Sequence, residues 1–242
     1  MTPRSAEAAR IAAAVSGVVE EVFGTVAEVR AAALHSLRQG NGAEGGAAEF
    51  PGLAEPLQAL LRRPGQLASG LGLMVAPSPS LDLRVHLHWW QLDPVIELVR
   101  ELDPDLRPDS VGFYDYPTAP WFAVPRRTGA RHVVGPHVDV HGTGQYLLTF
   151  TEPVLVRGTF LGVAGVDVAV SRFESHLLDR LGASGEAFLL ANDDDRVVLS
   201  TSPWWLVGSL LPARTAGAAG RTLPAAPWRL CLLDERGGSR PV

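Results

Sequence analysis

The sequence predicts an α+β fold: a long N-terminal helix packed on an antiparallel sheet, with a small C-terminal α+β lobe after it. Three observations support this class. An apolar stripe runs through the first 38 residues, strand-like segments with glycine turns fill residues 110–170, and short strand-like segments recur near the C-terminal end. We therefore expect three parts, at residues 1–50, 51–182 and 183–242.

The N-terminal helix is expected over residues 3–38, with Thr2 as its cap and Pro3 at the first helical position. Its stripe packs either on the rest of the chain or, in addition, on a second copy, so we expect a homodimer. The stripe repeats at spacings of three and four through Ile11, Val15, Val18, Val22, Val26 and Val29.

The next segment mixes short helices and strands. Residues 39–50 have loop composition, and a short helix with Leu57, Leu60 and Leu61 on one face follows. A strand is expected at 67–75, and the alternation of LDLRVHLHW at 81–89 predicts a half-buried antiparallel strand. Asp93-Pro94 predicts the start of a further short helix.

The main sheet is expected between residues 110 and 170. Its strand-like segments are VGFYDY, ARHVVGPHVDV, QYLLTFTEPVLV and TFLGVAGVDVAV, with turns at residues 141–144 and at 157–158. A helix at 171–181 leaves this sheet. AFLLAN, RVVLST and WRLCLL then predict only a small second lobe.

Composition and charge limit the function. The chain has 242 residues, 46% of them hydrophobic and 19% charged, as in ordinary globular proteins. A formal charge of −5 argues against nucleic acid as a partner. Cys231 is the only cysteine, which excludes an internal disulfide and fits a reducing compartment. No run of 18 apolar residues occurs, so we expect a cytoplasmic protein without a membrane partner.

Four segments, in order, resemble the Cache family of PAS-like bacterial ligand sensors. TFTEPVLVRGTFLGVAGVDVAVSRFESHLL resembles the family's core hairpin and helix, and GEAFLLANDDDRVVLSTSP resembles the start of a second Cache lobe. TAPWFAVP and GPHVDV resemble two ligand-site segments. The resemblance implies a double-Cache protein with an abbreviated second lobe. It implies a PAS-like ligand-binding domain at 51–182 that signals in trans, for example to a transcriptional regulator.

The resemblance also implies a ligand site. Amino-acid-binding members carry a Tyr, an Arg five positions later and then Trp-Tyr; the Arg holds the ligand carboxylate, and Asp residues hold its amine. Here Ala119 stands at the Arg position and His137 at a position where Tyr is common. The implied ligand-binding residues are Tyr114, Trp121, Phe122, His137, Asp139 and Asp167.

A small amine is the ligand that this set favours. Aromatic faces and carboxylates suit an ammonium group, whereas a carboxylate is usually held by an Arg fork. The alternative is a small carboxylate held by Arg126, Arg127 and His137, with Arg131 close by in the sequence.

Structural roles remain open for several of these residues. Trp121 and Phe122 also suit a core, and Asp139 also suits a turn cap. Asp167 interrupts an otherwise apolar strand and needs a partner, either a backbone amide or a ligand. The pair His86 and His88 lacks a third metal ligand, and the acidic run Asn192–Asp195 is expected to be a hairpin turn rather than a calcium loop.

Enzyme function finds little support in the sequence. It contains no G-x-S-x-G elbow, P-loop, G-x-G-x-x-G or H-E-x-x-H motif. We therefore expect a binding protein without a cofactor or metal. An enzyme using His137 with Asp139 or Asp167, and a scaffold dimerised through the N-terminal helix, are the competing hypotheses.

Overall fold

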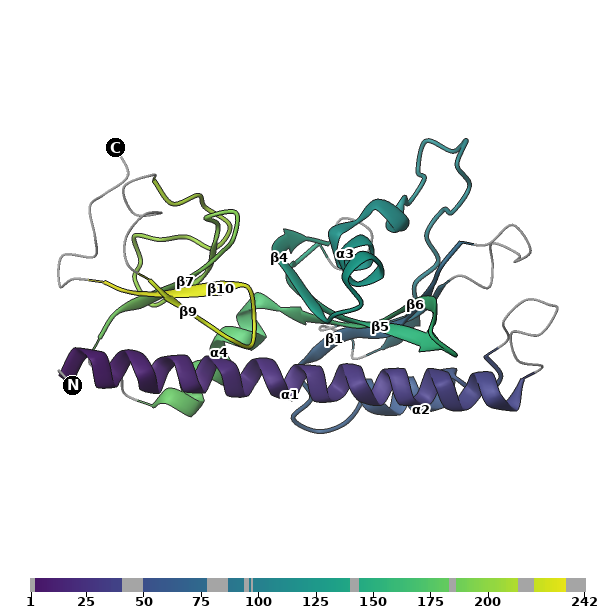
Figure 1. Ribbon diagram of the computed structural model, residues 1–242, viewed down its shortest axis with the longest axis horizontal. Helices are drawn as coiled ribbons and strands as arrows, with labels where there is room; N and C mark the ends of the chain where they lie inside the picture. Colours follow the sequence, from purple (N-terminus) through teal and green to yellow (C-terminus); the bar gives the residue numbers. More distant parts are fainter. Residues whose placement is uncertain are drawn as a thin grey trace.

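One long helix underlies two antiparallel sheets (Figure 1). The structure is a computed structural model and describes residues 3–40, 50–77, 87–93, 96, 98–139, 144–182, 186–212 and 220–233. The first-lobe elements are α1 (Pro3–Gln39), α2 (Ala54–Leu61), β1 (Ala68–Val75), β2 (Leu87–Leu92), β3 (Val99–Glu101), η2 (Tyr116–Thr118), α3 (Pro120–Thr128), β4 (His132–Val138), β5 (Tyr146–Val156), β6 (Thr159–Ala169) and α4 (Val170–Leu181). The second lobe contains β7 (Phe188–Asn192), β8 (Val197–Ser200), β9 (Arg221–Thr222) and β10 (Trp228–Leu232).

The two sheets differ in size. The first has six strands in the order β3-β2-β1-β6-β5-β4, and the second has four in the order β8-β7-β10-β9. This confirms the α+β class, with a long helix on an antiparallel sheet and a small second lobe. The short strand β9 was not expected from the sequence.

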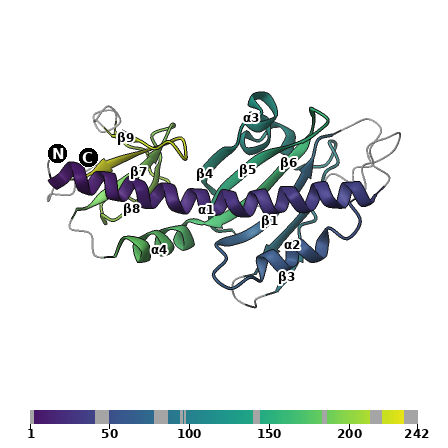
Figure 2. The same cartoon turned by 60° about the horizontal axis from the view of Figure 1, so that its bottom comes forward.

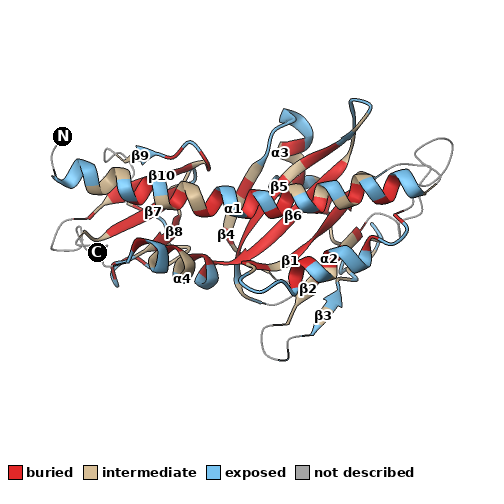
Figure 3. Ribbon diagram, turned by 90° about the horizontal axis from the view of Figure 1, so that it is seen from below, coloured by how far each residue is buried: buried red, intermediate tan, exposed pale blue. Residues whose placement is uncertain are grey.

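The apolar stripe of α1 is used within the chain. All six of its aliphatic side chains are at most 2% exposed, because they pack on the sheets and on α4. Figure 2 shows α1 crossing the strands of the first sheet, and Figure 3 shows it in front of strands that are largely buried. The stripe is therefore not available to pack on a second copy of the chain. The homodimer was expected because of this stripe, so that expectation has lost its basis.

The two lobes share one apolar core. Phe23 of α1 meets Phe150 of β5 edge to face at 5.4 Å between ring centroids. Trp228 of β10 meets Phe150 at 6.4 Å and Phe173 of α4 at 5.6 Å. Since aromatic pairs at these distances are mutually attractive, Trp228 anchors the second lobe to the first.

Both faces of the first sheet are covered. α1 and α2 lie on one face, and α3 lies on the other (Figure 1). His88, expected on a solvated face, is half-buried on the α2 side with its ring 5.1 Å from that of Phe50. The segment 78–86, including His86, lies outside the described residues.

One local prediction was wrong. VGFYDY was expected to be a strand, but it forms turns that lead into η2, and the helix α3 follows. Tyr116 explains part of this, because its hydroxyl donates to the Val75 carbonyl at 2.7 Å and holds the segment against the sheet. Pro120 then occupies the first turn of α3, where its missing N–H costs nothing. The helix expected at Asp93-Pro94 falls mostly outside the described residues, and β3 begins at Val99.

The second lobe begins with the expected hairpin. Asn192 accepts hydrogen bonds from the backbone N–H groups of Asp194 at 3.0 Å and Arg196 at 2.9 Å, so the acidic run is a turn. Within the described ranges, no cluster of three or more His, Cys, Asp or Glu side chains is suited to a metal ion. None of the described helices combines the length and hydropathy that a membrane crossing requires.

We predict that Val22→Asp lowers the free energy of unfolding by about 3–5 kcal/mol, because it buries a charge without a partner. Ala31→Asp on the exposed face of the same helix should cost less than about 1 kcal/mol, which reflects helix propensity alone. Urea unfolding of both variants measures the difference. Equal stabilities would contradict the packing of α1 described above.

Candidate ligand-binding site

A cavity opens on the face of the first sheet that lies opposite α1. The space between its walls, about 420 Å³, includes open solvent at its mouth. The centre of a water molecule can occupy only about 40 Å³ of it, so a ligand of few atoms fits best. The lining side chains are Met74, Trp89, Gln91, Leu102, Tyr114, Trp121, His137, Asp139, Leu147, Thr149 and Asp167.

Asp167 lies at the bottom of this cavity. It sits on β6 directly opposite Thr149 of β5, whose hydroxyl donates to Asp167 Oδ1 at 2.6 Å. The residue is 9% exposed, and burial raises its pKa to about 7; the hydrogen bond from Thr149 opposes this shift, and the nearby Asp139 adds to it. The carboxylate is therefore held in place but poorly solvated.

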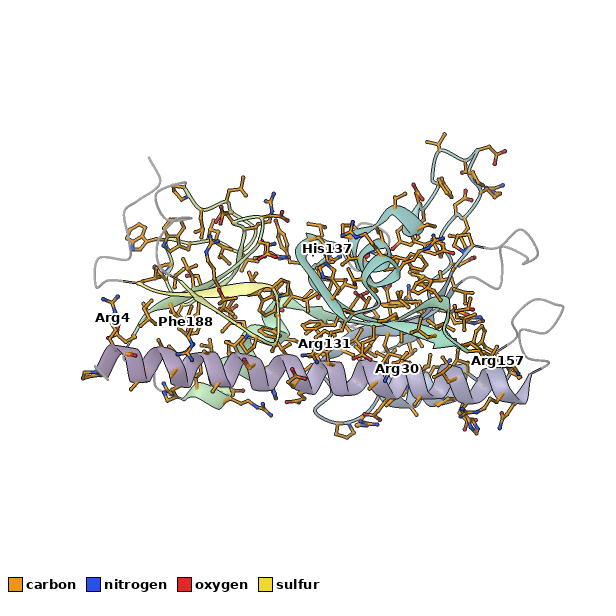
Figure 4. The ribbon with its side chains drawn as sticks, in the orientation of Figure 1. Arg4, Arg30, Arg131, His137, Arg157 and Phe188 are labelled. Atoms are coloured by element: carbon orange, nitrogen blue, oxygen red, sulfur yellow. The ribbon has the colours of Figure 1, made fainter. Side chains whose placement is uncertain are left out.

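Asp139 and His137 enter from the end of β4. Gln91 of β2 donates from Nε2 to Asp139 Oδ2 at 3.1 Å. His137 Nε2 lies 3.5 Å from the Thr149 hydroxyl, and burial lowers the pKa of its imidazole. His137 is therefore expected to be neutral at pH 7. Figure 4 places it on the side of the sheet away from α1.

Aromatic rings from the η2–α3 segment form the outer wall. The rings of Tyr114 and Trp121 lie 6.4 Å apart, and Tyr116 stacks on Trp121 at the same distance. The Thr151 hydroxyl donates to the Trp121 carbonyl at 2.8 Å, which fixes the start of α3 on β5. Burial raises the pKa of Tyr114, and the charges of Asp167 and Asp139 raise it further, so its hydroxyl stays neutral.

The structure brings five of the six expected site residues to one cavity. Trp121 and Asp167, which come from different elements, both line it, as do Tyr114, His137 and Asp139. Phe122 does not. Its side chain is fully buried behind Trp121 and meets the rings of Tyr116 and Phe160, so it belongs to the core.

The arginines of the alternative carboxylate site lie elsewhere. Arg126 and Arg127 are exposed in the last turn of α3 and do not line the cavity with His137. Arg131 points to the α1 side of the sheet (Figure 4), where it pairs with Glu20 at 2.5 Å and lies over the Phe23 ring at 4.3 Å. Among the cavity-lining residues that the structure describes, none is an arginine.

Three polar residues of the cavity were not expected from the sequence: Trp89, Gln91 and Thr149. Trp89 and Gln91 continue the alternation of the 81–89 segment, so the sequence indicates that they lie on the same face of a strand. It does not indicate that this face lines the cavity. Thr149 faces Asp167 only because the β5–β6 register shifts between Val154 and Leu155. No signal in the sequence marks that bulge.

We predict that Asp167→Asn stabilises the unliganded protein at about pH 8 by about 2–4 kcal/mol. The native pKa of about 7 exceeds the ordinary value of 3.8, so the folded state binds the proton more tightly. Stability conferred by the protonated carboxyl is therefore lost as pH rises from about 4 to about 7. Thermal unfolding should show a higher stability of Asp167→Asn than of the wild type at about pH 8, and this difference should disappear near about pH 4. The exposed Asp179→Asn is the control, and equal curves for both variants would refute the prediction.

Comparisons with known proteins identify the fold. No protein-family model matches the sequence, and no curated protein matches it either. The structure of methyl-accepting chemotaxis protein X superposes with a TM-score of 0.68 at 15% identity, over 93% of this chain and 94% of that one. The ligand-binding domain of the Pseudomonas aeruginosa PAO1 amino acid chemoreceptor PctB, in complex with L-Arg, gives 0.57 at 17% identity over 95% and 94%.

A third similar structure is the ligand-binding domain of the P. aeruginosa PAO1 amino acid chemoreceptor PctC in complex with GABA. Its TM-score is 0.54 at 19% identity, over 93% of this chain and 96% of that one. These similarities extend through both lobes and the shared helix. The chain therefore has the double-Cache fold of chemoreceptor ligand-binding domains.

Proposed function

We propose that the chain is a ligand-binding sensor domain whose first lobe takes up a small amine-bearing metabolite. One observation carries the proposal: Asp139 and Asp167 share a cavity walled by aromatic rings, and no described lining residue is an arginine. An ammonium group is the ligand charge that this set of side chains stabilises.

Electrostatics favour an amine over a simple carboxylate. Two carboxylates in one cavity repel each other, and a cation between them relieves that repulsion. The faces of Trp89, Tyr114 and Trp121 add cation–π attraction, about 0.5–2 kcal/mol for each favourable contact. A bound carboxylate would instead add a third negative charge, with Arg126 and Arg127 outside the cavity.

The similar solved structures support a sensor role and a nitrogen-bearing ligand. The PctB and PctC domains were solved with L-Arg and GABA, which carry both an amine and a carboxylate. The present chain keeps the acids expected to hold an amine and has Ala119 where the family pattern has an Arg. We therefore infer that the ligand of this chain is an amine without a carboxylate.

We also propose that the chain binds rather than catalyses, and that it reports to a regulator in trans. The cytoplasmic location inferred from the sequence, the transcriptional regulator as a partner and the homodimer all stay predictions. A dimer would have to use a surface other than the buried stripe of α1. Cell fractionation and sedimentation at micromolar concentration test the location and the dimer.

We predict that small primary amines bind and that carboxylates of the same size do not. Isothermal titration with n-propylamine, ethanolamine, propionate and lactate compares the two classes on the intact chain. Asp139→Asn should weaken amine binding about tenfold or more, because it removes one charge from the cavity. The exposed Asp179→Asn should bind as the wild type does. Binding of propionate or lactate without binding of any amine would refute the proposal.

We further predict that amine affinity falls about tenfold for each pH unit below about 7. The ammonium needs an ionised Asp167, and the pKa of that carboxyl in the empty site is about 7. Burial lowers the pKa of His137, which reduces the protonated fraction of its imidazole over this range. Titrations between about pH 5.5 and 8, with Asp167→Asn as the variant that lacks the titrating group, measure the slope. An affinity that is constant over this range would contradict the prediction.

A further inference from the structure

The indole of Trp89 lies across the first sheet on positions where glycines leave room for it. Trp89 is 3% exposed on β2 and pairs with Gly72 of β1, which in turn pairs with Gly165 of β6. A Cβ atom at Gly165 would lie 3.0 Å from Trp89 Cη2 and 3.1 Å from Cζ3. The benzene end of the indole therefore occupies the space that a side chain at Gly165 would fill.

Gly70 leaves room at the other end of the same ring. A Cβ atom there would lie 3.0 Å from Trp89 Nε1 and 3.4 Å from Asp167 Oδ2. The two glycine positions fix the direction of the indole, with its nitrogen toward Asp167. Larger side chains at Gly70 or Gly165 would push the ring away from this orientation, since Cβ contacts of 3.0 Å are too close for ordinary packing.

The indole N–H is a hydrogen-bond donor without an acceptor among the residues that the structure describes. Asp167 Oδ1 accepts from Thr149, whereas Oδ2, in the same described ranges, has no donor. Trp89 and Asp167 both line the cavity. Trp89 Nε1 and Asp167 Oδ2 both lie within 3.4 Å of the position that a Cβ atom at Gly70 would occupy. The cavity therefore presents a fixed N–H donor beside a carboxylate oxygen.

A fixed donor in a mostly enclosed site selects among ligands. A ligand that displaces water from this N–H must replace the hydrogen bond that the water makes. An apolar group at that place leaves the N–H unpaired, which is unfavourable. Sites built to pair with a polar ligand group reject analogues that lack the group far better than they reject a change in size.

We propose that the Trp89 N–H determines ligand specificity by donating to a neutral oxygen that the ligand carries close to its amine. This inference rests on the proposed amine site and narrows its ligand class to short amines that carry a hydroxyl or carbonyl oxygen near the nitrogen. The ammonium meets Asp167 and Asp139, and the oxygen meets Trp89 Nε1. Simple alkylamines and tetraalkylammonium ions fall outside this class because they offer no acceptor.

Ethanolamine and n-propylamine test the proposal, because they have the same number of heavy atoms and differ only at the terminal group. The wild-type chain should bind ethanolamine about tenfold more tightly than n-propylamine in isothermal titration. Trp89→Phe keeps an aromatic ring but removes the N–H, so the two affinities should become nearly equal. Trp121→Phe is the matched control: it should weaken both ligands and leave their ratio near tenfold.

The possible failures are distinguishable. Equal affinities of the wild type for the two amines would overturn the role of Trp89, and this comparison does not depend on the folding of any variant. A tenfold ratio that persists in folded Trp89→Phe would also overturn it, because the oxygen would then pair elsewhere. Binding of neither amine, with binding of propionate or lactate, would overturn the proposed amine site itself.

Discussion

The packing of α1 against both sheets is the constraint on which the rest of the structure depends. Its stripe is buried within the chain, and Phe23, Phe150 and Trp228 join the two lobes into one core. α1 and α2 cover one face of the first sheet, and the cavity that holds Asp139 and Asp167 lies on the opposite face. α3 and the aromatic segment before it cover part of that face and leave the cavity beside them.

Much of this fold was readable in the sequence because its signals are local. The period of the α1 stripe, the glycine turn after β5 and the apolar β6 each predict one element without reference to the others. Arg157 and Gly158 both adopt positive φ angles in that turn, as a tight hairpin requires. The strand expected for VGFYDY was wrong for the opposite reason. Its aromatic residues favour a strand locally, but contacts with distant residues, such as the hydrogen bond from Tyr116 to β1, hold it in turns.

The site was only partly readable because its polar contacts depend on register and on distant strands. Continuing the pairing of Val156 with Thr159 would place Thr149 opposite Val166, and only the bulge brings it opposite Asp167. The direction of the Trp89 indole similarly depends on Gly70 and Gly165, which lie on two other strands. The resemblance supplied Tyr114, Trp121 and the acids, but it also implied a ligand contact for Phe122, which the structure places in the core.

The placement of Asp167 connects stability with ligand sensing. A buried carboxyl with a pKa near 7 costs free energy when it ionises in the empty cavity, and a cation bound beside it recovers that energy. Binding of a cation therefore stabilises the folded state most at the pH values at which Asp167 is ionised, which are those at which its burial costs the empty protein most. The neighbouring strand β4 carries His137 and also contacts the second lobe, because Asn192 donates to the Gly135 carbonyl at 3.0 Å. The strand β4 therefore borders the cavity through His137 and contacts the second lobe through Gly135. A change in the charge of the site takes place close to the contact between the two lobes.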